Sequence, residues 1–292
     1  MVYEAGKVSV VIISFNHAPY IEECIESILC QNYKIFEIII IDNNSTDNTN
    51  EILEKYSYNN SISIIKLPVN KGVSGGINEG LTRVSGEYVI FFASDDVMVS
   101  DRLHKQVNFM RNTPDADACF GNMLRINSDS SVNSNGLLPL VGLKCWSLAD
   151  ILFSRVKLYS PTQMYKTESF MQAVNKLPDD IRIEDIWTYH KFLTKGFKLY
   201  TIPHLLTLYR VHPNNTHTKY KMMMNEKIKI LDEYKSEDYY KDALNFIYLE
   251  HFSNFGSTSK KDALSLLPKV VFNLRSKYLY IGIARLLLDW RR

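Results

Sequence analysis

Cysteine is scarce in this sequence, and long apolar runs are absent. The four cysteines among 292 residues show neither CxxC spacing nor a dense framework, which predicts reduced thiols in a cytoplasmic protein. No apolar run reaches the length of about 18 residues that a membrane-spanning helix requires. The N-terminus lacks the basic segment, apolar stretch and small-residue cleavage site of a signal peptide. These absences argue against a membrane-spanning or secreted chain.

A strong charge of one sign is also absent from most of the chain. The hydrophobic fraction of 46% and the charged fraction of 23% are close to globular averages, which excludes disordered and fibrous proteins. The net charge is +2, but residues 260–292 contain eight basic and two acidic residues, which leaves 26 basic and 30 acidic residues in 1–259. Basic residues are therefore concentrated in the C-terminal tail, and we expect no nucleic-acid partner.

Segments with the patterns of strands and helices alternate through the first hundred residues. Continuous β-branched runs predict strands buried on both faces, and apolar residues at helical spacing predict helices between them. We expect strands at 8–15, 37–41, 62–67 and 88–93, and helices at 20–31, 48–57 and from the glycine-rich segment 70–80 to about residue 86. This alternation predicts an α/β fold of right-handed βαβ units, with a Rossmann-like, mostly parallel sheet flanked by helices.

The pattern after residue 100 is less regular. The polar segment 127–135 has no assigned structure, and after Pro213 the pattern is helical almost to the end. We therefore expect a core domain over 1–217 and a helical C-terminal extension over 218–292, with the boundary in 214–221. The further elements expected in the core are a helix at 101–112, a strand at 163–166, a helix at 185–195 and a strand pair leading to Tyr209-Arg210.

Polar residues follow three of the expected strands at the point where each ends. They are Asn16-His17, Asp42 to Ser45, and Ser94-Asp95-Asp96. Because ligands bind at the carboxyl edge of such sheets, we expect these segments to converge on one crevice. The alternative is that each segment only caps the following helix. Adjacent carboxylates repel unless a cation or a proton relieves them, and Mg²⁺ or Mn²⁺ suits such a site and commonly holds a diphosphate.

Six blocks of residues follow one another in the order found in family 2 glycosyltransferases. They are VSVVIISFNHAPYIEECIESILCQNY, EIIIIDNNSTDNT, NKGVSGGINEGL, GEYVIFFASDD, EDIW and YRVH. The chain resembles this family over residues 7–217, and is most similar to its bacterial polysaccharide-assembling members. The resemblance implies an inverting, nucleotide-sugar-dependent enzyme of the GT-A fold. It also implies a catalytic domain with a nucleotide-sugar half over 1–100 and an acceptor half over 101–217.

The resemblance assigns the nucleoside pocket to the ends of the first two strands and to the loop before the glycine-rich helix. Asp42 matches the acidic residue that recognises uracil, where a carboxylate accepts from the ring N3–H. Asn43 stands where the family usually has a second Asp. The glycines at 72, 75, 76 and 80 also suit turn geometry and close helix packing, and their spacing is not that of a GxGxxG motif. The other implied contacts are Ser14, Phe15, Asn16, Asn70, Lys71 and Gly72.

Ser94-Asp95-Asp96 corresponds to the DXD region of the family, with Ala93 in the place of the usual first Asp. The resemblance implies that Ser94 and Asp95 contact the nucleotide-sugar, that Asp95 coordinates Mn²⁺ or Mg²⁺, and that Asp96 is a second ligand or an orienting residue. His212 matches a histidine that completes the metal sphere in some relatives. Arg210 could neutralise phosphate or form an ion pair within the core.

Glu184-Asp185 followed by Trp187 resembles the ED motif, in which the Asp is the general base. An inverting transfer needs one carboxylate within hydrogen-bond reach of the acceptor hydroxyl. The alternative for Glu184 and Asp185 is electrostatic stabilisation of a helix N-terminus. Trp187 could form an acceptor-stacking wall or could belong to the core.

The resemblance and the basic tail together suggest where the enzyme works. We expect transfer of a hexose or N-acetylhexosamine from a UDP-sugar to a saccharide acceptor, carried on a polyprenyl diphosphate at the inner face of the cell membrane, in surface polysaccharide synthesis such as O-antigen or capsule. A basic amphipathic helix ending in Trp290 suits an anionic membrane surface, whereas the alternative is a helix docked on the core. Two rival functions are a sugar nucleotidyltransferase and a non-catalytic nucleotide-sugar-binding module.

Overall fold

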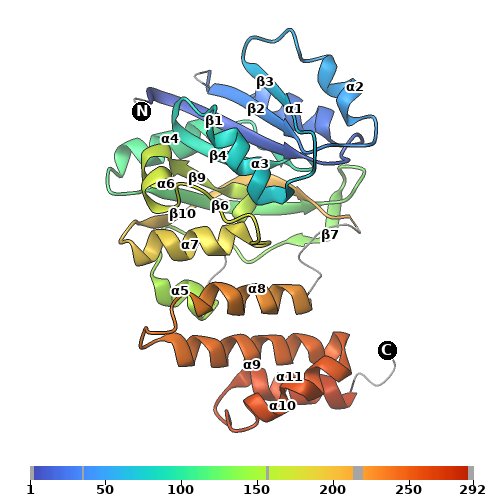
Figure 1. The fold of residues 1–292 in the computed structure, drawn as a ribbon, viewed down its shortest axis with the longest axis vertical. Coiled ribbons are helices and arrows are strands. Elements are labelled where there is room, and N and C mark those ends of the chain that lie inside the picture. Colours follow the sequence, from blue (N-terminus) through green and yellow to red (C-terminus); the bar gives the residue numbers. More distant parts are fainter. Residues whose placement is uncertain (1–2, 35, 156–157, 213–219, 289–292) are drawn as a thin grey trace. The chain divides into compact units, whose positions relative to one another are not determined.

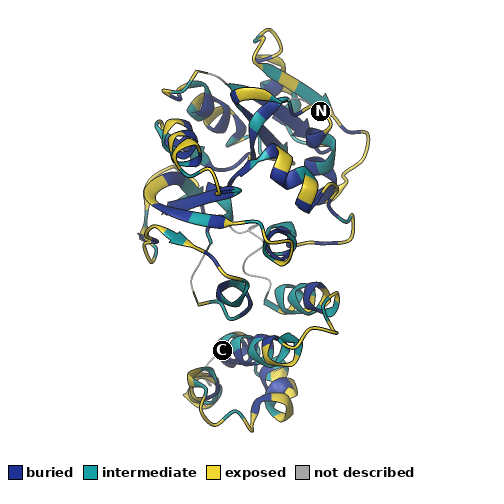
Figure 2. Ribbon diagram, turned by 90° about the vertical axis from the view of Figure 1, so that its left-hand side faces the viewer, coloured by how far each residue is buried: buried dark blue, intermediate teal, exposed yellow. Residues whose placement is uncertain are grey.

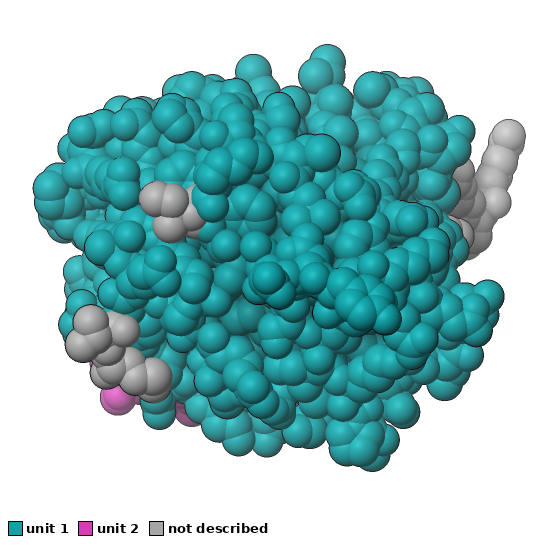
Figure 3. Space-filling view, turned by 90° about the horizontal axis from the view of Figure 1, so that it is seen from above, with its two compact units in different colours: residues 1–148, 156–213 teal, residues 149–155, 214–292 magenta. Residues whose placement is uncertain are grey.

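The computed structural model describes residues 3–34, 36–155, 158–212 and 220–288. The chain forms two compact units. Unit 1 comprises residues 1–148 and 156–213, and unit 2 comprises residues 149–155 and 214–292 (Figure 3). Most of the boundary segment 214–221 lies outside the described residues, and the functional division at residue 217 stays a prediction.

A mixed sheet of ten strands forms the centre of unit 1 (Figure 1). The strand order is β3-β2-β1-β4-β9-β6-β10-β5, with β7 beside β6 and β8 beside β10. The first four strands of this order pair in parallel, as expected, and the antiparallel β9 joins them to the parallel pair β6 and β10. The α/β class is confirmed. The bounds are β1 Glu4–Ser14, β2 Phe36–Asp42, β3 Ile62–Lys66, β4 Gly86–Ala93, β5 Val97–Met98, β6 Ala118–Ile126, β7 Val132–Leu137, β8 Lys144–Cys145, β9 Met164–Lys166 and β10 Leu199–Arg210.

Strand β1 lies between β2 and β4 and is covered on both faces. Its Val10, Val11 and Ile12 side chains are fully buried, which explains why both faces of this strand are β-branched and apolar. In Figure 2 most of the central strands are dark blue, the colour of buried residues. The parallel register places Ser14 beside Asp42 of β2, and Ile13 beside Ala93 of β4. Three strand ends therefore lie side by side at the carboxyl edge.

Helices cover both faces of the sheet. The helices α1, α2 and α4 pack on one face, and α3, α6 and α7 lie on the other. Gly80 of α3 lies so close to β1 that a Cβ there would overlap the Val11 side chain, which supports the packing interpretation of this glycine. The bounds are α1 Ile21–Leu29, α2 Thr49–Glu54, α3 Gly72–Leu81, α4 Arg102–Asn112, α6 Thr167–Ala173 and α7 Glu184–Thr194, with a short 3₁₀ helix at Ser160–Thr162.

The structure adds short elements such as β5, β8 and α6 to those expected in unit 1, and it differs from the sequence prediction in two further places. The unassigned polar segment leads through a turn into β7, which pairs antiparallel with β6. The strand pair expected before Tyr209-Arg210 is wrong, because β10 is one strand of twelve residues. Its register shifts between Thr201 and Thr207, around Pro203. Proline cannot donate to the strand ladder, so the pattern resembles a break between two strands.

Unit 2 is helical, as expected after Pro213. Its core lies between α9, α10 and α11 and includes Phe252, Phe255, Leu266 and Leu279. The single amphipathic helix expected for the tail is wrong: the tail forms two helices, and Trp290 lies outside the described residues. No helix in the described part of the chain is long and apolar enough to cross a membrane. The bounds are α5 Leu148–Leu152, α8 Tyr220–Asp232, α9 Tyr240–Thr258, α10 Lys260–Val270 and α11 Lys277–Leu288.

His251 on α9 makes the stability of unit 2 depend on pH. Its ring is buried, and neither ring nitrogen has a hydrogen-bond partner among the described residues. Burial, followed by the charge of Lys227 on α8, lowers its pKa from 6.5 to about 4, against the opposing effect of Glu250. Below pH 6.5 the unfolded chain therefore binds a proton that the folded chain does not. The stability from the neutral ring is complete above pH 6.5 and is lost as the pH falls towards 4.

We expect this residue to lower the free energy of unfolding of unit 2 by about 2 kcal/mol between pH 7 and pH 5. Replacing His251 by Gln, which is neutral at both pH values, should remove that part of the pH dependence. Urea unfolding of the full chain, followed by helical circular dichroism at the two pH values, measures the difference. An unchanged pH dependence in the variant would contradict the assignment.

Candidate functional site

The three strand ends converge at the carboxyl edge of the sheet, as the sequence predicts. Asn16 follows β1 with a positive φ of 55°. Its backbone N–H donates to Ser45 Oγ at 2.9 Å, and its side-chain Oδ1 accepts from the Thr46 N–H at 2.8 Å. His17 Nδ1 lies 2.7 Å from Ser94 Oγ. The segments after β1, β2 and β4 are therefore joined directly by hydrogen bonds.

Three side chains at this edge form a cluster that could hold a metal ion. They are His17, Asp95 and His212, and their ligand atoms all lie within 4.8 Å of one another. His212 Nε2 is 2.8 Å from Asp95 Oδ2, and Tyr20 stacks on the His212 ring with centroids 5.7 Å apart. The sequence indicates Asp95 and His212 for this role, but not His17. The signal for His17 is its place directly after Asn16 at a strand end.

The donor set fits a divalent transition-metal ion. Two imidazole nitrogens and one carboxylate oxygen suit Mn²⁺ better than Mg²⁺, which prefers oxygen ligands. Burial lowers the pKa of His17, which keeps its ring in the neutral form that binds metals. The cluster, taken over the described residues, contains neither Glu184 nor Asp185.

Asp96 is not part of this cluster. It is buried, and its Oδ1 accepts from the Arg210 backbone N–H at 2.9 Å, while Oδ2 has no hydrogen-bond partner among the described residues. Burial, and then the nearby charge of Asp95, raise the pKa of Asp96 well above its usual range. These contacts match the orienting role expected for Asp96 better than the ligand role.

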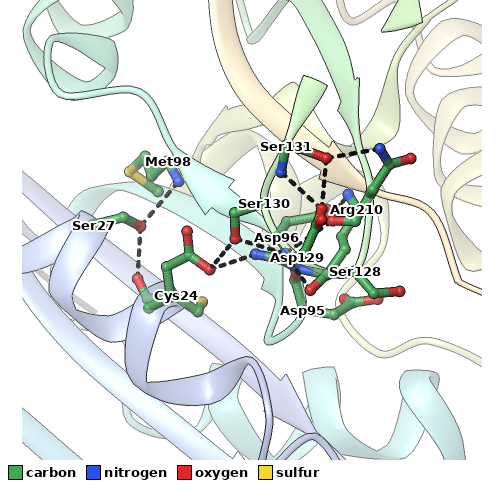
Figure 4. A network of polar contacts seen from close by, with 12 residues as sticks. Cys24, Ser27, Asp95, Asp96, Met98, Ser128, Asp129, Ser130, Ser131 and Arg210 are labelled. Atoms are coloured by element: carbon green, nitrogen blue, oxygen red, sulfur yellow. Dashed lines mark hydrogen bonds and ion pairs between the residues drawn. The ribbon is translucent and has the colours of Figure 1, made fainter. Parts of the chain in front are cut away.

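Arg210 is the centre of the polar network that surrounds the Asp95-Asp96 turn (Figure 4). The side chain is fully buried. Its Nε donates to the Asp95 backbone carbonyl at 2.7 Å, and Nη2 forms an ion pair with Glu23 on α1 at 2.6 Å. Nη1 donates to Ser130 Oγ at 2.9 Å and to the carbonyls of residues 127 and 128 at 3.1 and 3.2 Å. Of the two roles expected for Arg210, the structure shows an ion pair, with a Glu23 side chain that is 44% exposed, and the phosphate role stays a prediction.

Asp42 and Asn43 at the end of β2 are both buried. The Asp42 carboxylate oxygens lie 3.3 Å from the Ser45 backbone N–H. The Ser14 hydroxyl beside it is buried and has no hydrogen-bond partner in the described part of the chain, whereas the Phe15 ring is 41% exposed. Polar groups and a partly exposed aromatic residue at two adjacent strand ends suit the recognition of a flat heterocycle.

Asn43 holds the loop that leads into α3. Its Nδ2 donates to the Gly72 carbonyl at 2.9 Å, and its Oδ1 accepts from the Lys71 N–H at 2.8 Å. Asn70 Oδ1 accepts from the Gly72 N–H at 2.8 Å, and Gly72 has a φ of +70°, which favours glycine. An amide can donate and accept at once, but a carboxylate cannot. This explains why Asn is suited to position 43 here, where the family usually has Asp.

Replacing Asn43 by Asp should lower the free energy of unfolding of unit 1 by about 1–3 kcal/mol, because the buried side chain at position 43 loses its bond to the Gly72 carbonyl and places a carboxylate beside it. Urea unfolding followed by fluorescence of the buried Trp146 and Trp187 measures the change. The matched control is Asn44→Asp, since Asn44 is exposed with a φ of 66°, a conformation that Asp also tolerates. Equal stabilities of the two variants would contradict this role.

Glu184 and Asp185 begin α7. Asp185 Oδ1 accepts from the Ile186 N–H at 2.8 Å. Burial of the Glu184 carboxyl, and then the Asp185 charge, raise the pKa of Glu184 to about 8. Repulsion between the two neighbouring carboxylates therefore favours the protonated form of Glu184. Trp187 is buried, with the Lys191 ammonium 5.1 Å from its ring centroid, and this burial favours the core role over an acceptor wall.

Helix α3 holds the loop that precedes Glu184. Asn78 makes two hydrogen bonds to the backbone of Leu177, at 2.9 and 2.8 Å. The Ser74 hydroxyl donates to the Ile181 carbonyl at 3.1 Å. The glycine-rich segment therefore contacts the loop before the ED pair as well as carrying the loop after β3. Sequence reasoning assigns this segment to the nucleoside or to turn geometry and helix packing, because no local pattern shows a contact so far along the chain.

Comparison with known proteins identifies relatives of this chain. The model of glycosyl transferase family 2 matches residues 9–135. The putative teichuronic acid biosynthesis glycosyltransferase TuaG of Bacillus subtilis is 31% identical over 209 residues, which cover 71% of this chain and 80% of that protein. The poly-beta-1,6-N-acetyl-D-glucosamine synthase of Staphylococcus epidermidis is 27% identical over 192 residues, which cover 63% of this chain and 46% of that protein.

Solved structures share the fold. TarS 1–349 of S. aureus, in complex with UDP-GlcNAc, superposes with a TM-score of 0.68 at 20% identity, over 96% of this chain and 81% of that one. The mannosyltransferase PcManGT from Pyrobaculum calidifontis, in complex with GDP-Man and Mn²⁺, superposes with a TM-score of 0.61 at 15% identity, over 97% of this chain and 87% of that one.

Proposed function

Because this chain belongs to the family 2 glycosyltransferases, with their GT-A fold, we propose that it transfers a hexose or N-acetylhexosamine from a UDP-sugar to a saccharide hydroxyl with inversion at the anomeric carbon. The observation that carries this proposal is the convergence at one sheet edge of Asp42 with the cluster of His17, Asp95 and His212. A base-recognising carboxylate and a metal-binding cluster are together what a nucleoside diphosphate requires.

The donor is bound through its base and its diphosphate. Asp42 accepts a hydrogen bond from the uracil N3–H, and Phe15 packs on the base. Two relatives support a uridine nucleotide and an amino sugar: the structure of TarS holds UDP-GlcNAc, and the name of the S. epidermidis enzyme specifies N-acetyl-D-glucosamine. The loop of Asn70, Lys71 and Gly72 borders the nucleoside and is kept in place by Asn43.

His17, Asp95 and His212 would hold the divalent ion, and Mn²⁺ is the ion that their nitrogen and oxygen atoms favour. When bound, the ion neutralises the negative charge that develops on the departing diphosphate. Asp96 and Arg210 fix the turn that carries Asp95. The role of Asp96 and Arg210 is to keep the Asp95 carboxylate beside the two histidines.

Asp185 acts as the general base. Its carboxylate removes the proton from the acceptor hydroxyl, and the oxygen attacks the anomeric carbon on the face opposite the diphosphate. The bond from the anomeric carbon to the β-phosphate oxygen breaks, and UDP leaves with its electron pair. An α-linked donor therefore gives a β-linked product. Glu184, which is protonated at neutral pH, leaves the negative charge on Asp185.

The acceptor is a growing saccharide carried on a polyprenyl diphosphate, and the enzyme works at the inner face of the cell membrane in the synthesis of a surface polysaccharide. The names of two relatives, a teichuronic acid biosynthesis enzyme and a poly-N-acetylglucosamine synthase, support a polysaccharide product. The basic tail supports a position at an anionic membrane.

Calorimetric titration of UDP into the full chain, with and without Mn²⁺, tests the proposal. We expect Mn²⁺ to strengthen UDP binding, and His17→Ala to weaken the Mn²⁺-dependent binding by about 10- to 100-fold. The control His104→Ala, at an exposed histidine of α4, should bind like the wild type. Equal UDP affinity with and without Mn²⁺ would overturn the metal site, and absence of UDP binding would overturn the role of Asp42. Release of pyrophosphate in place of UDP during turnover would indicate a nucleotidyltransferase.

A further inference from the structure

The turn between α10 and α11 exposes large apolar side chains. We call residues 269–281 the α10–α11 corner. Within it Phe272 is 90% exposed, Leu274 67%, Tyr280 56%, and Val271 and Ile281 39% each. Single exposed apolar residues are ordinary on protein surfaces, but a concentration of this kind marks an interaction site.

Hydrogen bonds on the inner side of the corner hold this arrangement. Asn273 exchanges two side-chain hydrogen bonds with Asn245 of α9, at 2.7 and 3.0 Å, and its Nδ2 also donates to the Val270 carbonyl at 3.2 Å. Tyr280 Oη donates to the Leu274 carbonyl at 2.6 Å. Polar groups of the turn are thus satisfied inside unit 2, while Phe272 and Leu274 face outwards. The apolar side chains are held in place before any partner binds.

The charged residues of the corner, and of the chain on either side of it, are all basic, while Glu250 of α9, which acts on Tyr278, is paired with Lys227. Residues 263–288 contain four basic residues, Lys269, Arg275, Lys277 and Arg285, and no acidic residue. Lys269, Arg275 and Lys277 belong to the corner and are exposed. A second copy of the chain would bring these positive charges against one another, which disfavours self-association through this surface. An anionic bilayer surface complements both the charges and the apolar residues.

We propose that the α10–α11 corner is a bilayer-contact surface, in which Phe272 and Leu274 enter the boundary between headgroups and acyl chains of anionic lipids. Lys269, Arg275 and Lys277 lie at the rim and contact the lipid phosphates. The corner is the place where the membrane contact of the proposed function would occur. The proposed function supplies only the biological purpose of this contact. It requires no contact with the nucleotide-sugar.

Co-sedimentation of the full chain with lipid vesicles tests this surface. We expect the wild type to bind vesicles of phosphatidylcholine mixed with phosphatidylglycerol, to bind pure phosphatidylcholine vesicles much less, and to dissociate as salt is raised. The double variant Phe272→Ser/Leu274→Ser should bind anionic vesicles at least tenfold less. The control Tyr58→Ser, at an aromatic residue of unit 1 that is 93% exposed, should bind like the wild type.

Three outcomes would overturn the proposal: no binding of the wild type to anionic vesicles, wild-type binding by the double variant, or a dimer in lipid-free solution that the double variant abolishes. Thermal unfolding verifies that the variants fold, which the exposure of both side chains favours. UDP titration of the same proteins separates the two proposals. Failure to bind UDP leaves the vesicle result valid, and failure to bind vesicles leaves the nucleotide site valid.

Discussion

Replacing Asp185 by Asn should lower kcat by about 10²- to 10⁴-fold, the usual contribution of a general base, while UDP-sugar affinity changes little. The amide keeps the shape of the side chain and can still accept from the Ile186 N–H, as the carboxylate does at 2.8 Å. It cannot take a proton from the acceptor hydroxyl. A base makes its contribution in the transition state, so the loss should fall on kcat and not on donor binding.

The protonation state of Glu184 allows a second test of the Asp185 assignment. Its pKa of about 8 means that it is mostly protonated at pH 7, so the Glu184→Gln variant resembles the wild-type charge distribution. We expect that variant to retain far more activity than Asp185→Asn. If the two variants lost activity equally, the catalytic charge would be shared by the pair and would not belong to Asp185.

Single-turnover measurement of UDP release, with an oligosaccharide acceptor in excess, gives the chemical step directly. The matched control is Asp179→Asn, because Asp179 lies on the loop before α7 with a side chain that is 73% exposed and forms a surface ion pair with Lys176. Near-wild-type turnover in Asp185→Asn would refute the base assignment. A loss of kcat as large in Asp179→Asn would show that the loop, and not the carboxylate at 185, controls the rate.

The nucleotide half of the molecule could be predicted because its signals are local. Buried β-branched runs in β1, β2 and β4 define strands wherever they occur, and parallel pairing then brings the residues after each strand to one edge. Asn16, Asp42 and Asp95 follow from this rule alone, whereas Ser14 is implied only by the resemblance. His17 follows from it too, but one histidine after a strand end is not recognisable as a ligand until Asp95 and His212 are placed beside it.

Contacts between distant segments explain what the sequence did not predict. Arg210 and Glu23 are separated by most of unit 1, and nothing in either segment indicates that Glu23 is the partner of Arg210. In the sequence, Asn43 looks like a departure from an acidic motif. The structure gives the reason for Asn at this position: its Nδ2 donates to the Gly72 carbonyl. The strand β10 shows the same limit: its pairing continues past Pro203 because β6 and β5 supply partners that local sequence cannot reveal.

Replacing Arg210 by Lys should lower the free energy of unfolding of unit 1 by about 3–5 kcal/mol, the usual cost of breaking a buried charged network, and should also weaken Mn²⁺-dependent UDP binding. A lysine keeps the charge, but its three N–H donors are all on one nitrogen. That nitrogen cannot reach the Asp95 carbonyl, the Ser130 hydroxyl and Glu23 together. With the Asp95 carbonyl released, the turn that carries the Asp95 carboxylate loses its fixed orientation. Arg210 would then affect metal-dependent UDP binding only by positioning Asp95, without contacting the substrate or the metal.

The variant Arg102→Lys separates this positioning role from simple loss of stability. Arg102 is also fully buried, and its guanidinium donates to Gln106, Thr207 and the carbonyls of residues 161 and 163, none of which belongs to the metal cluster. Both variants should therefore unfold at lower urea concentrations. At a temperature where both remain folded, only Arg210→Lys should weaken UDP binding in the presence of Mn²⁺ more than in its absence. If Arg102→Lys had the same metal-dependent effect, the loss would reflect a loosened unit 1, and Arg210 would have no special place at the site.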